Sequence, residues 1–542
     1  MTTSFRIAID SLAYGQAGIG RTPEGKVVFV PKTAPGDLIE VELTRETSSY
    51  SEGIATSIIE PSPYRTTPAC PHANTCGGCP WMHITYPAQL EAKRSNVVNQ
   101  LSRIGGFSRD EAENLVGPCV PSKRELGYRN KLEFSTGYDQ QGKFALGLHE
   151  HGGTFIPIPK QCLLGAKGIE KAPGALRGAL AYLQGSTDLG IFRIGIRRSV
   201  RTQDTEIALW TKPCAFPRKI VADTLQSALK CSSIVRVIAD AGKARKVKKV
   251  EALFGKGSWS EEVDHQRYRI SAPSFFQVNT AQAEKMIDLV LGGLEVNEHS
   301  VVADLYCGAG TFTLPLAKRC DFVYAVESAA SSVRDLRRNI EAANLTNIEV
   351  IGGDSARELP SLGELDALVV DPPRAGLAKG VTQSIASTGA KRVAYVSCDP
   401  ATWARDIARF KAAGYTLTQA TPVDLFPQTY HVETVCLLTR EKSVKSYAYV
   451  DITPSELGIG GKVKKPTYKQ IQAYVLETHG LKVSPLYIAN VKDEFGLEKQ
   501  FSYEAAGMSA KKRPNCPPEK RAAIIDALIH FGMLDEDARE TE

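Results

Sequence analysis

The sequence predicts an α/β domain that follows a small β-barrel and a β-rich central domain and precedes a small helical extension. Three observations indicate this order. Short strand patterns separated by glycines fill residues 1–60, strand and helix patterns alternate over 301–440, and helical patterns occur in the Lys-rich end after residue 443. A chain of 542 residues has room for about three or four domains.

The expected boundaries follow changes in composition along the chain. We expect a β-barrel at 1–60, a cysteine-rich loop at 61–86, a helical segment packed on the α/β domain at 87–126, a β-rich domain at 127–274, the α/β domain at 275–442 and the helical extension at 443–542. In the barrel, strands are expected at 5–9, 27–30, 38–43 and 53–59, and the glycines between them, Gly18 and Gly20 included, are interpreted as turns.

Composition narrows the class of protein. A hydrophobic fraction of 43% and a charged fraction of 23% are typical of a soluble globular protein. We expect a cytoplasmic monomer, because the chain shows neither a secretory signal nor an apolar run approaching the roughly 20 residues of a membrane span. The net charge of +6 permits a nucleic-acid partner without arguing for one. Twelve cysteines in such a chain suggest metal ligands and a reactive thiol rather than disulfides.

Polar residues end the successive strands expected in the α/β domain. Glu327, Asp354, Asp371 and Cys398 each follow an apolar run, and an open α/β sheet binds its ligands at the carboxyl edge of its strands. A glycine-rich turn at 307–311 precedes Glu327 by about 20 positions, the spacing at which a carboxylate meets ribose hydroxyls. The third glycine of a dinucleotide fingerprint is missing, and no phosphate-binding Walker motif is present, so a dehydrogenase and a phosphotransferase are disfavoured.

Cys398 can be interpreted in two ways. Free cysteine is among the most buried residue types, so a structural thiol is the simple interpretation. Its place at the carboxyl edge of the fifth strand favours chemistry instead. A helix expected at 401–413 would point its positive end toward the sulfur, which leads us to expect a stabilised thiolate.

A second group of cysteines has metal-ligand spacing. Cys70, Cys76 and Cys79 lie within the stretch CPHANTCGGC, which is rich in glycine and polar residues. Thiolates this close in sequence can hold zinc or an iron–sulfur cluster, and spacing does not separate the two.

Four stretches carry a resemblance to a known family. Residues 304–312 (DLYCGAGTF) resemble motif I of class I S-adenosylmethionine-dependent methyltransferases, which have a Rossmann-like fold. Residues 371–376 (DPPRAG), 395–406 (YVSCDPATWARD) and 424–433 (DLFPQTYHVE) resemble the RNA uracil-C5 methyltransferases. The resemblance extends to about residue 440 and is closest to the iron–sulfur-containing 23S rRNA branch with an N-terminal TRAM domain. It implies that the β-barrel is an OB-like RNA-binding module. Asp399 stands where many relatives carry asparagine.

The resemblance implies a reaction and a set of site residues. Cys398 would add to carbon 6 of a uracil, and Glu433 would remove the proton from carbon 5 after methyl transfer. The fourth ligand of a [4Fe–4S] cluster, beside Cys70, Cys76 and Cys79, would be Cys162. The residues that would contact S-adenosylmethionine are Gln277, Tyr306, Thr311, Glu327, Asp354 and Asp371.

The nature of the RNA and of the activity stays open at this point. The resemblance favours 23S rRNA, with tRNA as the alternative and a non-catalytic RNA-binding or ribosome assembly factor as an alternative of another class. Amino methylation of a base, suggested by Asp371-Pro372-Pro373, is disfavoured because Arg374 replaces the expected aromatic residue. Basic clusters at 197–201 and 243–249 are candidate phosphate contacts. The C-terminal extension fits a helix-turn-helix-like binder or a docking module.

Overall fold

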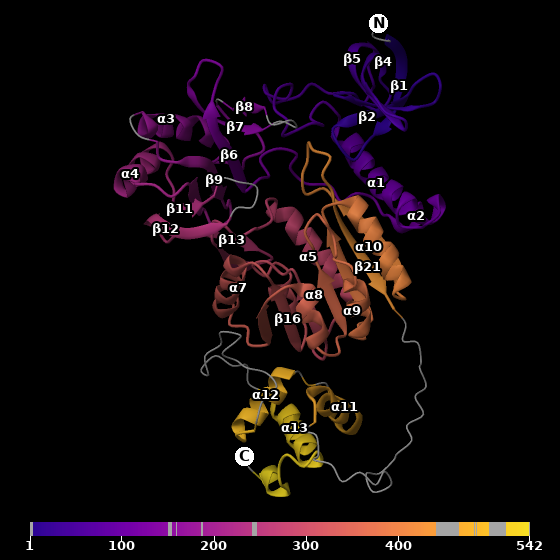
Figure 1. Ribbon diagram of the computed structural model, residues 1–542, viewed down its shortest axis with the longest axis vertical. Helices are drawn as coiled ribbons and strands as arrows, with labels where there is room; N and C mark the ends of the chain where they lie inside the picture. The colour runs from indigo at the N-terminus through magenta and orange to yellow at the C-terminus, as the bar shows by residue number, and fades with distance from the viewer. Residues whose placement is uncertain are drawn as a thin grey trace.

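The computed structural model describes residues 4–149, 154–158, 160–185, 188–240, 246–440, 466–481, 483, 485–497 and 516–540. Figure 1 shows a barrel and a central sheet at one end of the molecule, an α/β sheet in the middle and a group of helices at the other end. Within the described ranges, no helix has both the length and the apolar character needed to cross a membrane.

The N-terminal strands close into a barrel in the order β1-β2-β3-β5-β4. Gly18 and Gly20 lie within a strand, so their interpretation as turn residues is wrong. A Cβ on Gly18 would lie 2.2 Å from the Thr33 Oγ1, which shows that glycine serves close packing here. The barrel has a core of its own, formed by alternate residues such as Ile7, Val28 and Ile39. The strands are β1 (Ser4–Leu12), β2 (Ala17–Arg21), β3 (Val27–Pro31), β4 (Leu38–Glu46) and β5 (Tyr50–Glu60).

Helices α1 (Tyr86–Arg103) and α2 (Arg109–Leu115) lead from the cysteine-rich loop to the rest of the chain. Apolar side chains of α1, among them Val98 and Leu101, are buried in the same core as the α/β sheet. Lys93 of α1 donates to Asp424, and both side chains are fully buried. The segment is therefore tied to the α/β domain by apolar packing and by a buried ion pair.

The central domain is a seven-stranded sheet in the order β12-β11-β10-β9-β6-β7-β8. Its helix α4 (Arg218–Ala228) was not expected; it buries Val221, Ala222 and Leu225 on one face. A hairpin of β13 (Trp259–Val263) and β14 (Gln266–Ile270) leads to the next domain. The remaining elements are β6 (Lys131–Tyr138), β7 (Phe144–His149), β8 (Phe155–Pro157), α3 (Ala172–Gln184), β9 (Ile191–Arg198), β10 (Thr205–Thr211), β11 (Ser233–Ala239) and β12 (Val247–Gly255).

The α/β domain is a second seven-stranded sheet, in the order β17-β16-β15-β18-β19-β21-β20. The first five strands in this order are parallel, as the alternating pattern predicted, and β21 returns antiparallel to β19. The strands are β15 (Val301–Leu305), β16 (Phe322–Glu327), β17 (Ile348–Gly352), β18 (Ala367–Val370), β19 (Arg392–Ser397), β20 (Thr416–Val423) and β21 (Glu433–Thr439). The helices are α5 (Thr280–Leu294), α6 (Thr313–Ala317), α7 (Ala330–Ala342), α8 (Ser355–Glu358), α9 (Val381–Ser387) and α10 (Pro400–Ala412).

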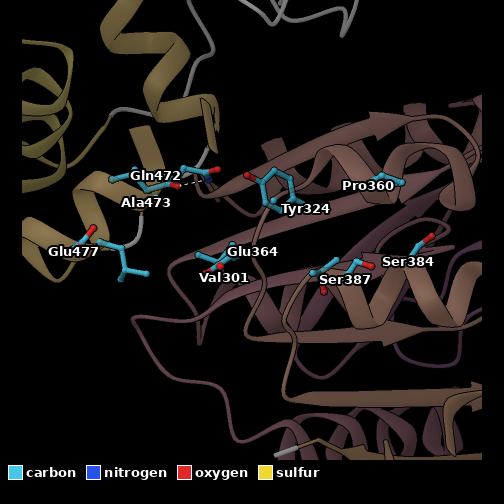
Figure 2. A pocket seen from close by; sticks show the side chains of 13 residues that line it. Val301, Tyr324, Pro360, Glu364, Ser384, Ser387, Gln472, Ala473 and Glu477 are labelled. Carbon is cyan, nitrogen blue, oxygen red and sulfur yellow. Dashed lines mark hydrogen bonds between the residues drawn. The ribbon is translucent and has the colours of Figure 1, made fainter. Parts of the chain in front are cut away.

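The C-terminal extension is helical, as expected, with α11 (Tyr468–His479), α12 (Pro485–Glu494) and α13 (Pro518–His530). It packs against the α/β sheet: the Tyr487 and Phe322 rings lie 5.6 Å apart, and Lys520 pairs with Asp321. A cavity of about 590 Å³ lies between α11 and the sheet, with Gln472 on one side and Tyr324 on the other (Figure 2). Val301, which begins β15, also lines it, so this cavity is at the amino end of the strands.

Candidate active site

The glycine-rich turn after β15 has a left-handed backbone at Tyr306 and Gly310, a conformation that lets other groups approach the main chain closely. Tyr306 has a φ of 62°, and Gly310 has a φ of 99°. A Cβ on Gly310 would lie 2.6 Å from side-chain atoms of Leu314 and Leu336. Glycine is therefore required at 310 both for the left-handed backbone and for helix packing. Thr311 lies half-buried in the same turn.

The acidic residues at the next two strand ends are held by backbone N–H groups. The Glu327 carboxylate accepts from Gly308 N at 2.9 Å and from Ala329 N at 2.6 Å. Glu327 is thereby bonded directly to the glycine-rich turn. Asp354 caps α8 by accepting from the backbone N–H groups of the next turn, and its charge also acts on the Tyr306 phenol.

Gln277 lies outside the sheet, in the loop between β14 and α5, and its side chain is buried. Asn130 of the central domain donates from Nδ2 to the Gln277 carbonyl oxygen at 2.9 Å. Asp335 of α7 accepts from the Ser271 N and from the Ser274 hydroxyl. The loop that carries Gln277 is thus fixed from both the central and the α/β domain.

Cys398 and Glu433 lie at the same end of the β19–β21 pair. Ser397–Thr434 is the last pair of this antiparallel ladder, and Cys398 follows Ser397 where Glu433 precedes Thr434. The Glu433 charge acts on the Cys398 thiol. Asp371 follows β18, the strand on the other side of β19. Two carboxyl groups therefore flank the half-buried thiol.

Burial raises the pKa values of Cys398, Glu433 and Asp371 above their usual values, and neighbouring charges add to this at Cys398 and Glu433. Burial and the charges of Glu433 and Asp371 raise the pKa of Cys398 to about 12, against the opposing effect of Arg374. Burial, and then the charge of Asp371, raises the pKa of Glu433 to about 8, again against Arg374. Burial raises the pKa of Asp371 to about 7. Near neutral pH the free protein therefore holds a thiol and a largely protonated Glu433.

The expectation of a stabilised thiolate is therefore wrong for the free protein. Helix α10 does begin beside Cys398, but Asp399 occupies its N-terminus. The Asp399 carboxylate accepts from Ala401 N at 3.0 Å and from Thr402 N at 2.9 Å. Its negative charge offsets the helix dipole, and its net effect is to raise the pKa of Cys398.

Three neighbours of this group were not among the predicted site residues. Arg374 is the cation that acts on both Cys398 and Glu433. Burial and then Arg374 lower the pKa of His431 to about 4, so its ring is neutral, and it lies 4.2 Å from the Tyr430 ring. Tyr14 reaches the site from the barrel. Arg374 and His431 lie inside recognised stretches and could have been chosen; nothing in the sequence marks Tyr14.

The four cysteines predicted to bind a cluster line one cavity of about 260 Å³. Burial, and then the charges of the neighbouring cysteines, Cys162 first, raise the pKa of Cys79 to about 12, against the opposing effect of Arg129. In the described ranges, no group of three or more His, Cys, Asp or Glu side chains has the arrangement of a metal-ion site. The structure therefore brings the four thiols to one cavity without closing them around a single point.

The basic cluster at 197–201 is divided, because Arg197 is buried and Arg201 is exposed. Arg197 is only 4% exposed and donates to the carbonyl oxygens of Ser271 and Ser274. Arg201 forms a salt bridge with Glu284. The prediction that Arg197 contacts RNA phosphates is therefore wrong. Of the cluster at 243–249, residues 243–245 lie outside the described residues, and Lys248 and Lys249 pair with acidic residues.

Comparisons with known proteins all find similarity to RNA methyltransferases. Residues 218–362 and 361–441 match the profile described as tRNA (Uracil-5-)-methyltransferase, and residues 3–56 match the TRAM domain. An uncharacterized RNA methyltransferase of Gloeobacter violaceus is 34% identical over 448 residues, which are 81% of this chain and 96% of that protein. One of Thermotoga maritima is 31% identical over 444 residues, covering 80% of this chain and 99% of that protein.

A solved structure extends the similarity to three dimensions. The Pyrococcus abyssi tRNA (uracil-54, C5)-methyltransferase, in complex with S-adenosyl-L-homocysteine, aligns with a TM-score of 0.62 and 26% identity. The alignment covers 80% of this chain and all of that one. With the barrel and the sheet order described above, this match confirms the predicted fold class.

Proposed function

The chain belongs to the RNA uracil-5-methyltransferase family, and on that premise we propose that it methylates carbon 5 of a uridine through a bond between Cys398 and carbon 6. Membership makes it an S-adenosylmethionine-dependent RNA methyltransferase. The observation that carries the proposal is that Cys398 and Glu433 lie at the same end of the β19–β21 pair, where the charges of Glu433, Asp371 and Arg374 act on the Cys398 thiol.

The reaction begins with the thiol of Cys398. Its proton leaves to solvent, the sulfur pair forms a bond to carbon 6, and the pair of the C5–C6 double bond moves toward carbon 5 and O4. Carbon 5 then takes the methyl group of S-adenosylmethionine, and the S–CH₃ bond breaks to leave S-adenosylhomocysteine. The Glu433 carboxylate accepts the proton from carbon 5, the double bond forms again, and the C6–S pair returns to sulfur.

The charges around the site support these roles. Arg374 lowers the pKa of both Cys398 and Glu433, so it favours the ionised form that each needs. The same cation can stabilise the negative charge that develops on the uracil ring after addition. The neutral His431, the Tyr430 ring and the Phe426 ring form an aromatic group beside the site, suited to a base turned out of its stack.

The methyl donor is assigned to the carboxyl edge of the sheet. Glu327 lies beside the glycine-rich turn, as a ribose-binding carboxylate should. The buried Gln277 is held firmly by its loop. Together with these two residues, we assign the donor site to Tyr306, Thr311, Asp354 and Asp371.

We assign a [4Fe–4S] cluster to Cys70, Cys76, Cys79 and Cys162. The four thiols share one cavity, and a four-iron cluster spans more space than a single ion. Their buried thiolates would repel one another, which a cationic iron core offsets. The cluster would fix the 70–79 loop against the central domain.

The RNA substrate is assigned on weaker similarity. We favour 23S rRNA, because the barrel and the cysteine group together resemble the ribosomal branch. tRNA is the second candidate, because the similar Pyrococcus abyssi enzyme acts on tRNA uracil 54. The expected domain boundaries, and a cytoplasmic location in which thiols stay reduced, are part of this proposal.

Mapping of 5-methyluridine tests the proposal. In cells lacking the gene, one or more such marks should disappear from 23S rRNA and return with the wild-type gene but not with Cys398→Ala. Loss of a tRNA mark instead would select the second candidate. Full return of the mark with Cys398→Ala would refute the covalent mechanism. It would favour a non-catalytic RNA-binding or assembly role, in which another enzyme makes the mark.

A further inference from the structure

Tyr14 brings the N-terminal barrel into contact with the candidate nucleophile. It lies at the tip of the β1–β2 hairpin, and its hydroxyl donates to the Cys398 carbonyl oxygen at 2.9 Å. Its ring meets the Tyr430 ring edge-on, with the centroids 5.6 Å apart. A residue of the barrel therefore contacts both the strand end that carries Cys398 and the loop that leads to Glu433.

The hairpin tip is itself held in place. Ala13 N donates to Ala17 O at 2.9 Å within the hairpin. The buried Trp81 donates from Nε1 to Gly15 O at 3.1 Å, and from its backbone N to Gln428 O at 3.2 Å. Trp81 thus connects the tip to the 424–433 loop. Because the hairpin tip is fixed in this way, the Tyr14 side chain is held in one place and can position the groups that it contacts.

The hydrogen bond from Tyr14 reaches the backbone of Cys398 just beyond the end of the β19–β21 ladder. Ser397 is the last residue of β19 paired with β21, and Cys398 lies one residue beyond. The Asp399 carboxylate accepts from the backbone N–H groups that begin α10, and a carboxylate has no proton to donate to the Cys398 carbonyl oxygen. Tyr14 supplies that contact from a position 384 residues away in the chain.

The phenol is suited to act as a permanent donor. Burial, and then the charges of Asp399, Cys398 and Glu433, raise the pKa of Tyr14 far above its usual value. The hydroxyl therefore keeps its proton at any pH at which the protein works. Its hydrogen bond to the carbonyl does not switch with pH.

We propose that Tyr14 is a positioning residue for the nucleophile, which holds the Cys398 carbonyl and thereby sets the angle at which the sulfur meets carbon 6. This rests on the proposed function. The barrel then contributes to the chemical step as well as to RNA binding. Geometry of this kind matters because small displacements of a reacting atom cost much rate.

The experiment compares Tyr14→Phe with a matched variant. Tyr50→Phe removes a hydroxyl from the same barrel, where the Tyr50 ring packs on Phe29. Full-length protein is mixed with S-adenosylmethionine and with 23S rRNA and tRNA transcripts that contain 5-fluorouridine, and the covalent complex is followed at saturating RNA. We expect Tyr14→Phe to form it about tenfold more slowly, the effect of about 1.4 kcal/mol on a barrier. RNA affinity and melting temperature should stay within about twofold and about 2 °C of wild type.

A second measurement needs no RNA. Iodoacetamide is added to the free protein, and alkylation of Cys398 is read by peptide mass spectrometry against the exposed Cys214. Loss of the hydroxyl frees the loop, so Cys398 should react several-fold faster in Tyr14→Phe, while Cys214 and the Tyr50→Phe protein react as wild type.

The outcomes separate the two proposals. Slower complex formation with unchanged RNA affinity supports the positioning role. Rates equal to wild type in both assays, or a loss explained by weaker RNA binding alone, overturn it. No complex with wild-type protein, together with faster alkylation in Tyr14→Phe, would refute the proposed reaction while keeping the contact between Tyr14 and Cys398.

Discussion

Replacing Asp399 with asparagine should make Cys398 more reactive. The substitution removes a negative charge beside the thiol but keeps an oxygen that can accept from Ala401 N and Thr402 N. Asparagine caps helices as well as aspartate does, so little stability is lost. The Asp399 charge is among the causes that raise the pKa of Cys398 to about 12, after burial and two other carboxylates. Without that charge the pKa falls.

The size of the effect follows from screening. A half-exposed charge on a neighbouring residue acts on a thiolate with about 1 kcal/mol, the value for two unit charges about 4 Å apart in water. That energy corresponds to about fivefold more thiolate at a given pH. A less basic thiolate is also a weaker nucleophile, with a Brønsted slope of about 0.4–0.5, which removes about half of the gain. The net expectation is alkylation about two- to threefold faster.

The assay is iodoacetamide modification of Cys398 in the free protein, read by peptide mass spectrometry across a pH series. In wild type the rate should rise about tenfold per pH unit, with no plateau below about pH 10, because the thiol titrates at about 12. Asp139→Asn is the matched control, since Asp139 also accepts from two backbone N–H groups, of Gln141 and Lys143. A wild-type plateau near pH 7, or slower reaction in Asp399→Asn, would refute the reasoning.

Three further predictions address the base, the scaffold and the cysteine group. Glu433→Gln should lower turnover about 10²–10⁴-fold and let the methylated covalent complex accumulate. Because the base acts when ionised, turnover of wild type should rise with pH through about 8, and a flat wild-type profile would contradict this. Lys93→Met should destabilise the protein by about 3–5 kcal/mol, or about 6–20 °C in melting temperature, because it leaves Asp424 buried without its cation. Adding Asp424→Leu should restore most of that loss in a thermal scan; no recovery would count against the buried ion pair as the cause. Anaerobic reconstitution with iron and sulfide should give broad visible absorption that Cys76→Ser abolishes and Cys214→Ser leaves intact, and equal spectra in both variants would exclude the assigned ligands.

The strand ends could be predicted from the sequence because parallel strands bring their carboxyl ends to one edge. Glu327, Asp371 and Cys398 each follow a recognisable apolar run. The proximity of Cys398 and Glu433 could not be derived this way, because β21 lies between β19 and β20 and no local sequence pattern predicts that strand order. Glu433 was chosen on family resemblance alone.

Other differences came from contacts between distant segments. Gly18 and Gly20 resemble turn residues, but their small size serves packing against residues of other strands in a closed barrel. The ionisation of Cys398 was misjudged because the helix dipole was considered without burial, without the Glu433 and Asp371 charges and without the Asp399 carboxylate that caps the helix. Arg197 was predicted to be a surface cation because it lies in a basic cluster, but the structure buries its side chain. In each case the deciding neighbour lay on another element, or its charge was left out.

The hydrogen bond between Tyr14 and Cys398 joins two parts of the chain that are synthesised at different times. Tyr14 of the barrel is synthesised before Cys398, which follows 384 residues later. At about 5–20 residues per second, this separation corresponds to about 20–80 s. During that interval the closed sheet and separate core of the barrel allow it to fold without the rest of the chain. The nascent chain can therefore form the hydrogen bond between Tyr14 and Cys398 only after the α/β domain has been synthesised and has met the barrel.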